Sequence, residues 1–149
     1  MSGRSILSIS AAAVTLLIGT GAHITSASAG DSYVSIEQHG YSNGAGGGQH
    51  GHRNRLTVYQ DGHRNSVSSS QYGSYNRAVT GQSGSRHSAT SFQNGRGNIA
   101  GIAQFGTGHT VVTSQDGSGN AVGVIQAGRN NRATTTQIGA GNVSVIVQD

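Results

Sequence analysis

The stretch QAGRNNRATTTQIGAGNVSVIVQ, residues 126–148, contains three glutamines spaced eleven residues apart. The same spacing continues towards the N-terminus without an interruption. Eleven glutamines keep this phase: Gln38, Gln49, Gln60, Gln71, Gln82, Gln93, Gln104, Gln115, Gln126, Gln137 and Gln148. Because a disordered chain has no reason to keep one phase over so many copies, the spacing indicates a structural repeat.

The unit around each glutamine is Q-x-G-x-x-N followed by five variable residues. Two residues after the glutamine stands a glycine, at Gly40, Gly51, Gly62, Gly73, Gly84, Gly95, Gly106, Gly117, Gly128 and Gly139. Five residues after it stands an asparagine or a histidine, at Asn43, Asn54, Asn65, Asn76, His87, Asn98, His109, Asn120, Asn131 and Asn142. Glycine accepts positive φ and asparagine tolerates the left-handed region, so the motif predicts a turn at these glycines.

An eleven-residue period also fits a right-handed coiled coil, because eleven residues nearly fill three helical turns. Each glycine, however, would cost a helix about 0.8–1.0 kcal/mol relative to alanine, and ten copies exclude it. The residues between asparagine and glutamine alternate instead. The second one is apolar in every copy but the last, whereas Arg55, Arg77 and Arg132 occupy the first position, on the opposite face. This alternation predicts strands.

The fourth position after asparagine shows that the full period is 22 residues. In alternate units this position is mostly apolar, with Ile36, Val58, Thr80, Ile102, Val124 and Ile146. In the units between them it is never apolar, with Gly47, Ser69, Ser91, Thr113 and Thr135. Two different strands and two turns therefore make one rung. We predict an all-β fold, a flattened cross-β solenoid with two strands per 22-residue rung, eleven strands and about five rungs.

Stacked rungs lie about 4.7–4.8 Å apart, so identical side chains lie above one another. We predict that the phased glutamines, together with Asn43, Asn54, Asn65, Asn76, Asn98, Asn120, Asn131 and Asn142, form amide ladders that run up the stack. A buried amide without a partner is costly, and the next copy supplies that partner. Solvent-facing glutamines in flexible loops would not need the phase. The strand-prone segment Val143–Gln148 lacks the Lys or Pro that blunts natural edge strands, so we expect stacking to continue from chain to chain.

Residues 1–29 are typical of a secretory signal peptide. Arg4 gives a positive start, Ile6–Ile18 is largely apolar, and Ala27–Ala29 gives a small-residue cleavage site. The chain has no cysteine, so a secreted domain of this size is no disulfide scaffold. Its mild positive charge is too weak to indicate a specific nucleic-acid partner.

The repeat resembles that of the curlin family, the subunits of bacterial curli amyloid fibres. The family pattern S-x5-Q-x-G-x-x-N-x-A-x3-Q is matched in full by Ser32, Gln38, Gly40, Asn43, Ala45 and Gln49. This resemblance implies secretion across the inner and outer membranes through an outer-membrane curli secretion channel with accessory factors. It further implies assembly at the cell surface into an adhesive biofilm fibre, with copies of itself and a companion nucleator or major subunit as partners.

The resemblance leaves the type of subunit open. The presence of the motif glycine in every repeat resembles the pattern of nucleator subunits. The glycine-rich run Asn43–Gly48, in contrast, resembles the export leader of major subunits. We divide the chain into the signal peptide at 1–29, an N-terminal segment at 30–53 with a degenerate first repeat that serves as an export tag, and the amyloid core at 54–149.

Neither catalysis nor a cofactor is predicted. Imidazole suits Zn or Cu, but eleven residues move the chain to the opposite turn, so His39 does not meet His50, nor His52 meet His63, on adjacent rungs. We interpret these histidines as exposed turn residues and leave metal binding open. The alternative function is a soluble secreted β-solenoid that binds a ligand on a flat face, to which Thr134–Thr136 points.

Overall fold

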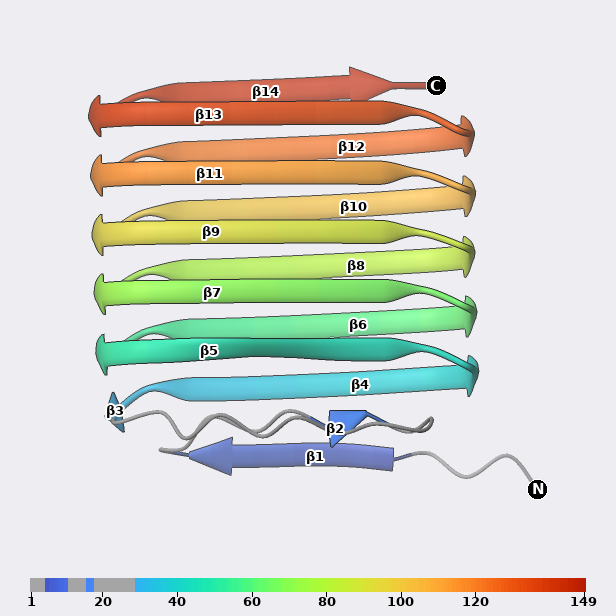
Figure 1. The fold of residues 1–149 in the computed structure, drawn as a ribbon, viewed down its shortest axis with the longest axis horizontal. Helices are drawn as coiled ribbons and strands as arrows, with labels where there is room; N and C mark the ends of the chain where they lie inside the picture. Colours follow the sequence, from blue (N-terminus) through green and yellow to red (C-terminus); the bar gives the residue numbers. More distant parts are fainter. Residues whose placement is uncertain (1–4, 11–15, 18–28) are drawn as a thin grey trace.

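The computed structural model describes residues 5–10, 16–17 and 29–149 (Figure 1). This part of the chain holds fourteen strands and no helix, and so no helix that could span a membrane. The strands are β1 (Ser5–Ser10), β2 (Leu16–Leu17), β3 (Ala29–Gly30), β4 (Tyr33–Tyr41), β5 (Gly44–His52), β6 (Arg55–His63), β7 (Ser66–Ser74), β8 (Arg77–Ser85), β9 (Ser88–Arg96), β10 (Ile99–Thr107), β11 (Thr110–Ser118), β12 (Ala121–Arg129), β13 (Arg132–Ala140) and β14 (Val143–Gln148). Most of the predicted signal peptide, residues 1–29, lies outside the described residues.

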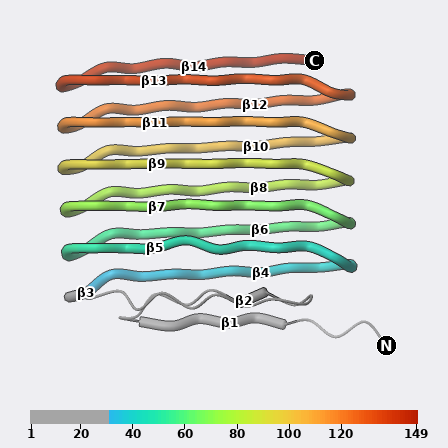
Figure 2. The backbone as a smooth tube through the Cα atoms, in the orientation of Figure 1, coloured from blue at the N-terminus to red at the C-terminus, as the bar shows by residue number. Residues whose placement is uncertain are grey.

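Two parallel sheets lie face to face and the chain alternates between them (Figures 1 and 2). Sheet A contains β4, β6, β8, β10, β12 and β14, and sheet B contains β5, β7, β9, β11 and β13. Neighbouring strands pair with a register of 22 residues, as in Gln82 with Gln104. β1 adds antiparallel to β4, while β2 and β3 pair with β5. The predicted flattened β-solenoid with two strands per 22-residue rung is confirmed.

The strands run further than the motif suggested. Each of β4–β13 has nine residues and continues past the motif glycine, which pairs with the glycine of the next rung, as Gly84 does with Gly106. The ladder therefore includes the ten glycines that the sequence assigned to turns, and the tight turn is only two residues long. Gly84 has φ +122°, and a Cβ there would lie 2.0 Å from the Gly106 carbonyl oxygen. Glycine is required because adjacent rungs approach through their backbones at this point.

The interior is a thin layer between the two sheets, and the sheets contribute different side chains to it. Sheet A points Leu56, Val58 and Val124 inwards, each at most 2% exposed. Sheet B points Val111 inwards, but also the hydroxyl side chains of residues such as Thr113. Burying one Val or Leu side chain contributes about 1.5–3 kcal/mol, so the apolar part of each rung is small and the amide positions at the strand ends become important.

Candidate functional site: the amide columns and the open strand edges

The glutamines form one buried column in each sheet. In both columns the Nε2 of one glutamine donates to the Oε1 of the glutamine 22 residues further on, over 2.5–3.1 Å. The sheet A column is Gln38, Gln60, Gln82, Gln104, Gln126 and Gln148, and the sheet B column is Gln49, Gln71, Gln93, Gln115 and Gln137. All amides point the same way, so each column has a direction.

Each of these glutamines from Gln49 onwards also links the two sheets. The second Nε2 hydrogen of Gln93, on β9, donates over 3.0 Å to the backbone carbonyl of Arg77, on β8 of the other sheet. Both N–H groups of this fully buried amide therefore donate, to Gln115 and Arg77, and its Oε1 accepts from Gln71. Removing one such side chain would leave several buried groups without partners, each at a cost of about 1–3 kcal/mol.

The asparagines occupy the bends between the sheets. Asn76 is representative: its Nδ2 donates to the carbonyls of Tyr72 and Gly95, and its Oδ1 accepts the backbone N–H of Asn98. The same three bonds are made by Asn43, Asn54, Asn65, Asn98 and Asn120. Each bend is therefore held by hydrogen bonds to the end of the strand before it and to the backbone of the next rung.

The asparagine pattern is incomplete at the last rung. Asn131 keeps only the short bond from its Nδ2 to the Ala127 carbonyl, because no described residue lies where the next rung would supply an acceptor. Gln137 and Gln148 likewise donate to a backbone carbonyl, but to no further glutamine in the part of the chain that the structure describes. At the opposite end, Gln38 and Gln49 donate to the next rung, and no described residue donates to their Oε1 atoms.

The edge strands at this last rung carry exposed apolar side chains. Ile138 on β13 is 76% exposed, and Val143, Val145 and Val147 on β14 are 67–74% exposed. No described strand lies beyond β13 or β14. β14 carries no charged side chain and β13 carries only Arg132. A parallel edge with unpaired backbone groups and few blunting charges is a template for another strand.

A comparison with known protein families identifies the repeat independently of its geometry. The model of the curlin associated repeat matches residues 30–62, 51–84 and 110–139, which is more than half of the chain. The chain belongs to the curlin repeat family. This family is structural and not enzymatic. Curated proteins and solved structures offer no significant match to the chain.

Two of the curlin repeats replace the bend asparagine with histidine, and sequence reasoning gave these residues no role. His87 and His109 are buried in the bends that lead into the sheet B strands β9 and β11, at positions where other bends have asparagine. Their rings stack with centroids 5.0 Å apart and an interplanar angle of 7°. The Nδ1 of His87 accepts the backbone N–H of His109, while its Nε2 lies 3.1 Å from the Ser83 carbonyl. An accepting Nδ1 and a donating Nε2 define the neutral ring. The signal in the sequence was their spacing of 22 residues.

Burial lowers the pKa of His87 below its ordinary value, and the neighbouring His109 lowers it further, while the hydrogen bonds to the Ser83 and Gly106 backbones act in the opposite direction. Protonation would place a hydrogen on Nδ1, where the backbone N–H of His109 already points. The Nδ1 of His87 therefore keeps its place in the column only while it carries no hydrogen.

Of the other described histidines, His50 and His52 are exposed, and His39 and His63 are half-buried. His50 stacks on Tyr72 at 4.9 Å and Tyr41 stacks on His63 at 5.0 Å, and the Nε2 of His39 lies 2.8 Å from Glu37. Within residues 5–10, 16–17 and 29–149, no three His, Cys, Asp or Glu side chains gather into a group that could hold a metal ion.

Proposed function

We propose that this protein is the structural subunit of an extracellular functional amyloid fibre, which grows by stacking the rungs of one copy on those of the next. The observation that carries the proposal is the direction of the two glutamine columns. Within the described residues, the columns end in donors without a further glutamine at Gln137 and Gln148, and they begin with acceptors at Gln38 and Gln49. Sheet A contributes six of the stacked strands and sheet B five. A second copy turned by half a turn about the stacking axis, with its β4 on β13 and its β5 on β14, would therefore continue both columns with the bond already used between rungs.

Contact of this kind is head to tail, because one end offers donors and the other offers acceptors. A head-to-tail contact between identical copies does not close on itself unless a rotation closes a ring, so it produces an open filament. Sheet A's N-terminal edge, β4, is paired with β1, which lies within the predicted signal peptide. Removal of residues 1–29 would open that edge as well.

Membership of the curlin family supports the setting of this assembly. We propose that residues 1–29 direct the chain across the inner membrane, and that an outer-membrane curli secretion channel with accessory factors exports it. Residues 30–53 then serve as the export tag and residues 54–149 as the fibre core. At the cell surface the fibre contributes to adhesion and biofilm matrix, together with a companion major or nucleator subunit.

The test is assembly of purified residues 30–149 with and without preformed seeds, followed by sedimentation and fibre diffraction. We expect seeded growth and a reflection at about 4.7–4.8 Å. Gly84→Ala should abolish growth, because its Cβ would meet the Gly106 backbone at 2.0 Å. Gly81→Ala is the matched control on the same strand, since a Cβ there meets nothing within 4 Å.

Two outcomes would contradict the proposal. Equal growth of the Gly84→Ala and Gly81→Ala variants would mean that the fibres do not contain this solenoid. A protein that remains monomeric at high concentration would support the alternative, a soluble secreted β-solenoid that binds a ligand on a flat face.

A further inference from the structure

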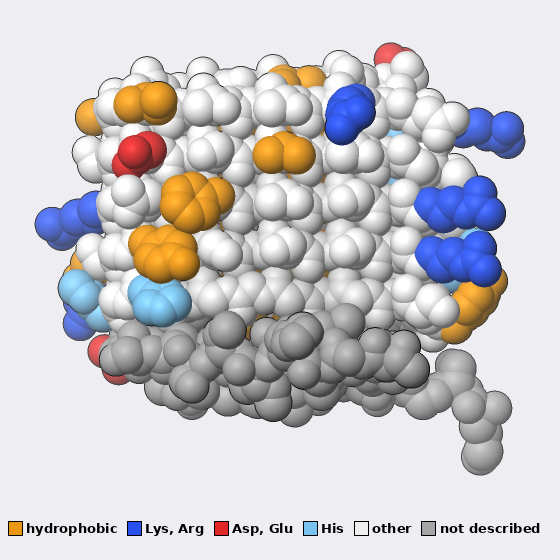
Figure 3. Space-filling view, in the orientation of Figure 1, with side chains coloured by type: hydrophobic (Ala, Val, Ile, Leu, Met, Phe, Trp, Pro, Cys, Tyr) orange, Lys and Arg blue, Asp and Glu red, His pale blue; other side chains and the backbone are white. Residues whose placement is uncertain are grey.

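The outer faces of the two sheets differ in polarity. On β10, β12 and β14 of sheet A, the outward residues are the alternate positions of 99–105, 121–127 and 143–147, and every one of them is apolar or glycine. We call this surface the apolar face. The outward positions of sheet B, which faces the viewer in Figure 3, are mostly polar. No charged side chain lies within the apolar face, and Arg77 on β8 lies just beyond it.

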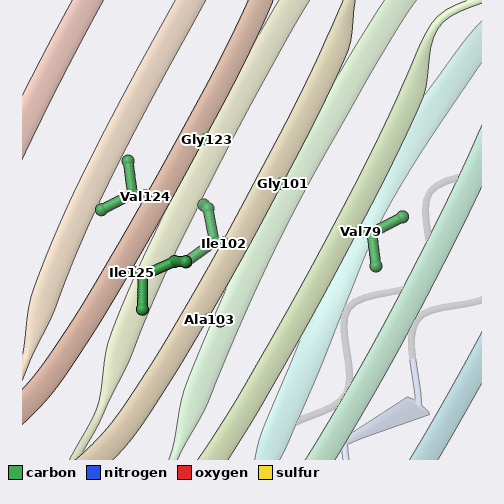
Figure 4. A pocket seen from close by; sticks show the side chains of 7 residues that line it. All are labelled: Val79, Gly101, Ile102, Ala103, Gly123, Val124 and Ile125. Carbon is green, nitrogen blue, oxygen red and sulfur yellow. The ribbon is translucent and has the colours of Figure 1, made fainter. Parts of the chain in front are cut away.

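The apolar face contains a shallow groove (Figure 4). Gly101 and Gly123 form it by leaving the outer surface of adjacent strands without side chains, so that Ile102 and Val124 of the interior contribute to its lining. A Cβ added at Gly123 would meet nothing within 4 Å, which shows that no described residue fills the groove. Ile125 stands beside the groove as a ridge and is 45% exposed.

We infer that the apolar face is a lateral docking surface for the same face of a second fibre of this protein; this inference rests on the proposed fibre. A groove beside a ridge is self-complementary, because the Ile125 ridge of one copy fits the glycine groove of the other. Both fibres are built from the same copy at the same rung spacing of about 4.7–4.8 Å, so the groove and ridge of each copy recur at equal intervals in the two fibres. A globular partner would match that periodicity at only one place.

The size of the apolar face indicates when pairing occurs. Three strands spaced about 4.8 Å apart and seven residues of about 3.3 Å each cover roughly 300 Å². A stable interface buries about 800 Å² per partner, so two single copies should not pair through this face. In a fibre whose successive copies are related by a half-turn, the face recurs on each side with every second copy, and several linked contacts together exceed that area. Lateral docking is therefore a property of fibres and follows their growth.

The uncharged character of the face distinguishes a second fibre from other occupants. Nucleic acid and anionic lipid surfaces are held mainly by Lys and Arg, and the apolar face has neither. Two copies of the same apolar face, in contrast, lose no charge hydration when they meet. The glycines also allow the two backbones to approach closely, as in a dry steric zipper.

The experiment compares Ile125→Lys with Val112→Lys in fibres of the protein. Ile125 and Val112 are both outward and comparably exposed, at 45% and 37%, but Val112 lies on β11 of sheet B. Growth is followed by the sedimented fraction and by the 4.7–4.8 Å reflection, and pairing by electron microscopy of fibre width. We expect Ile125→Lys to lower the fraction of paired fibres about tenfold or more, since a charge buried without a partner is strongly unfavourable. Val112→Lys should leave pairing unchanged.

Several outcomes would overturn the docking surface while leaving the fibre intact. These are wild-type fibres that never pair, pairing that survives Ile125→Lys, or equal loss of pairing in both variants. Loss of binding of a flat aromatic dye with unchanged pairing would assign the groove to small ligands instead. If Ile125→Lys prevents growth, Ile125→Asn, which adds no charge, is used in its place. Failure of the wild-type protein to form fibres would instead reject the proposed function.

Discussion

Sheets A and B are built alike at their strand ends and differently in their centres. Both have a glutamine column and a run of paired glycines, with the same bonds and the same register. In the centre of the strands, sheet A buries Val58, Ile102 and Val124 where sheet B buries hydroxyl side chains. The glutamine columns and paired glycines, which both sheets have, therefore specify the rung and the axis of growth. The central side chains, which differ, make the two sides of the rung distinguishable.

The shared columns should give the largest effects, and the effects should be equal in the two sheets. Gln93→Ala removes the partner of Gln71, Gln115 and the Arg77 carbonyl, all at one buried site. Gln104→Ala does the same in sheet A. At about 1–3 kcal/mol for each orphaned group, we expect a loss of about 3 kcal/mol or more, which raises the critical concentration for growth about a hundredfold.

The control for this comparison is Asn94→Ala, next to Gln93 on the same strand. Asn94 faces outwards and loses only an exposed bond to Asp116, so the critical concentration should change little. The measurement is the soluble protein left at equilibrium with fibres. If one sheet tolerated its glutamine substitution and the other did not, the columns would not be equivalent.

The central positions should show opposite effects in the two sheets. Val124→Thr places a hydroxyl between the apolar Ile102 and Ile146 neighbours and should destabilise the fibre by about 1–3 kcal/mol. Thr113→Val removes a buried Oγ1 that has no hydrogen-bond partner in the described structure, and should stabilise it by about 1 kcal/mol. The midpoint of guanidinium dissolution measures both. A loss of stability in both variants would show that the Thr113 hydroxyl does have a partner in the fibre.

The sequence predicted what depends on period and alternation: the 22-residue rung, the strands and the parallel register. It misplaced the glycines in turns, because the approach of Gly84 to the Gly106 carbonyl involves only backbone atoms and leaves no mark on side-chain pattern. It also missed the bond from Gln93 to Arg77, which depends on how the two sheets face each other. The apolar face is confined to the last three strands of sheet A, whereas β6 and β8 present Arg55 and Arg77 at the same outward positions, so no repeat over the whole chain marks it.

The bends allow a last comparison between the sheets. The bends that lead into β6, β8, β10, β12 and β14 of sheet A all carry asparagine, whereas those that lead into sheet B strands include His87 and His109. The folded state lowers the pKa of His87, chiefly by burial, so the unfolded chain binds more protons than the fold at acid pH. The stabilising contribution of the neutral ring is complete above the unfolded pKa of about 6.5. It is lost as the pH falls towards the lowered folded pKa.

We therefore expect the critical concentration of the wild-type protein to rise as the pH falls below about 6.5, by at most about tenfold per pH unit from this one group. The variant His87→Asn/His109→Asn restores the residue found in most bends and should remove that rise. His50→Asn, a change at an exposed histidine, should keep it. The critical concentration at several pH values checks all three proteins. An unchanged profile in the double variant would mean that the burial of His87 does not couple proton binding to assembly.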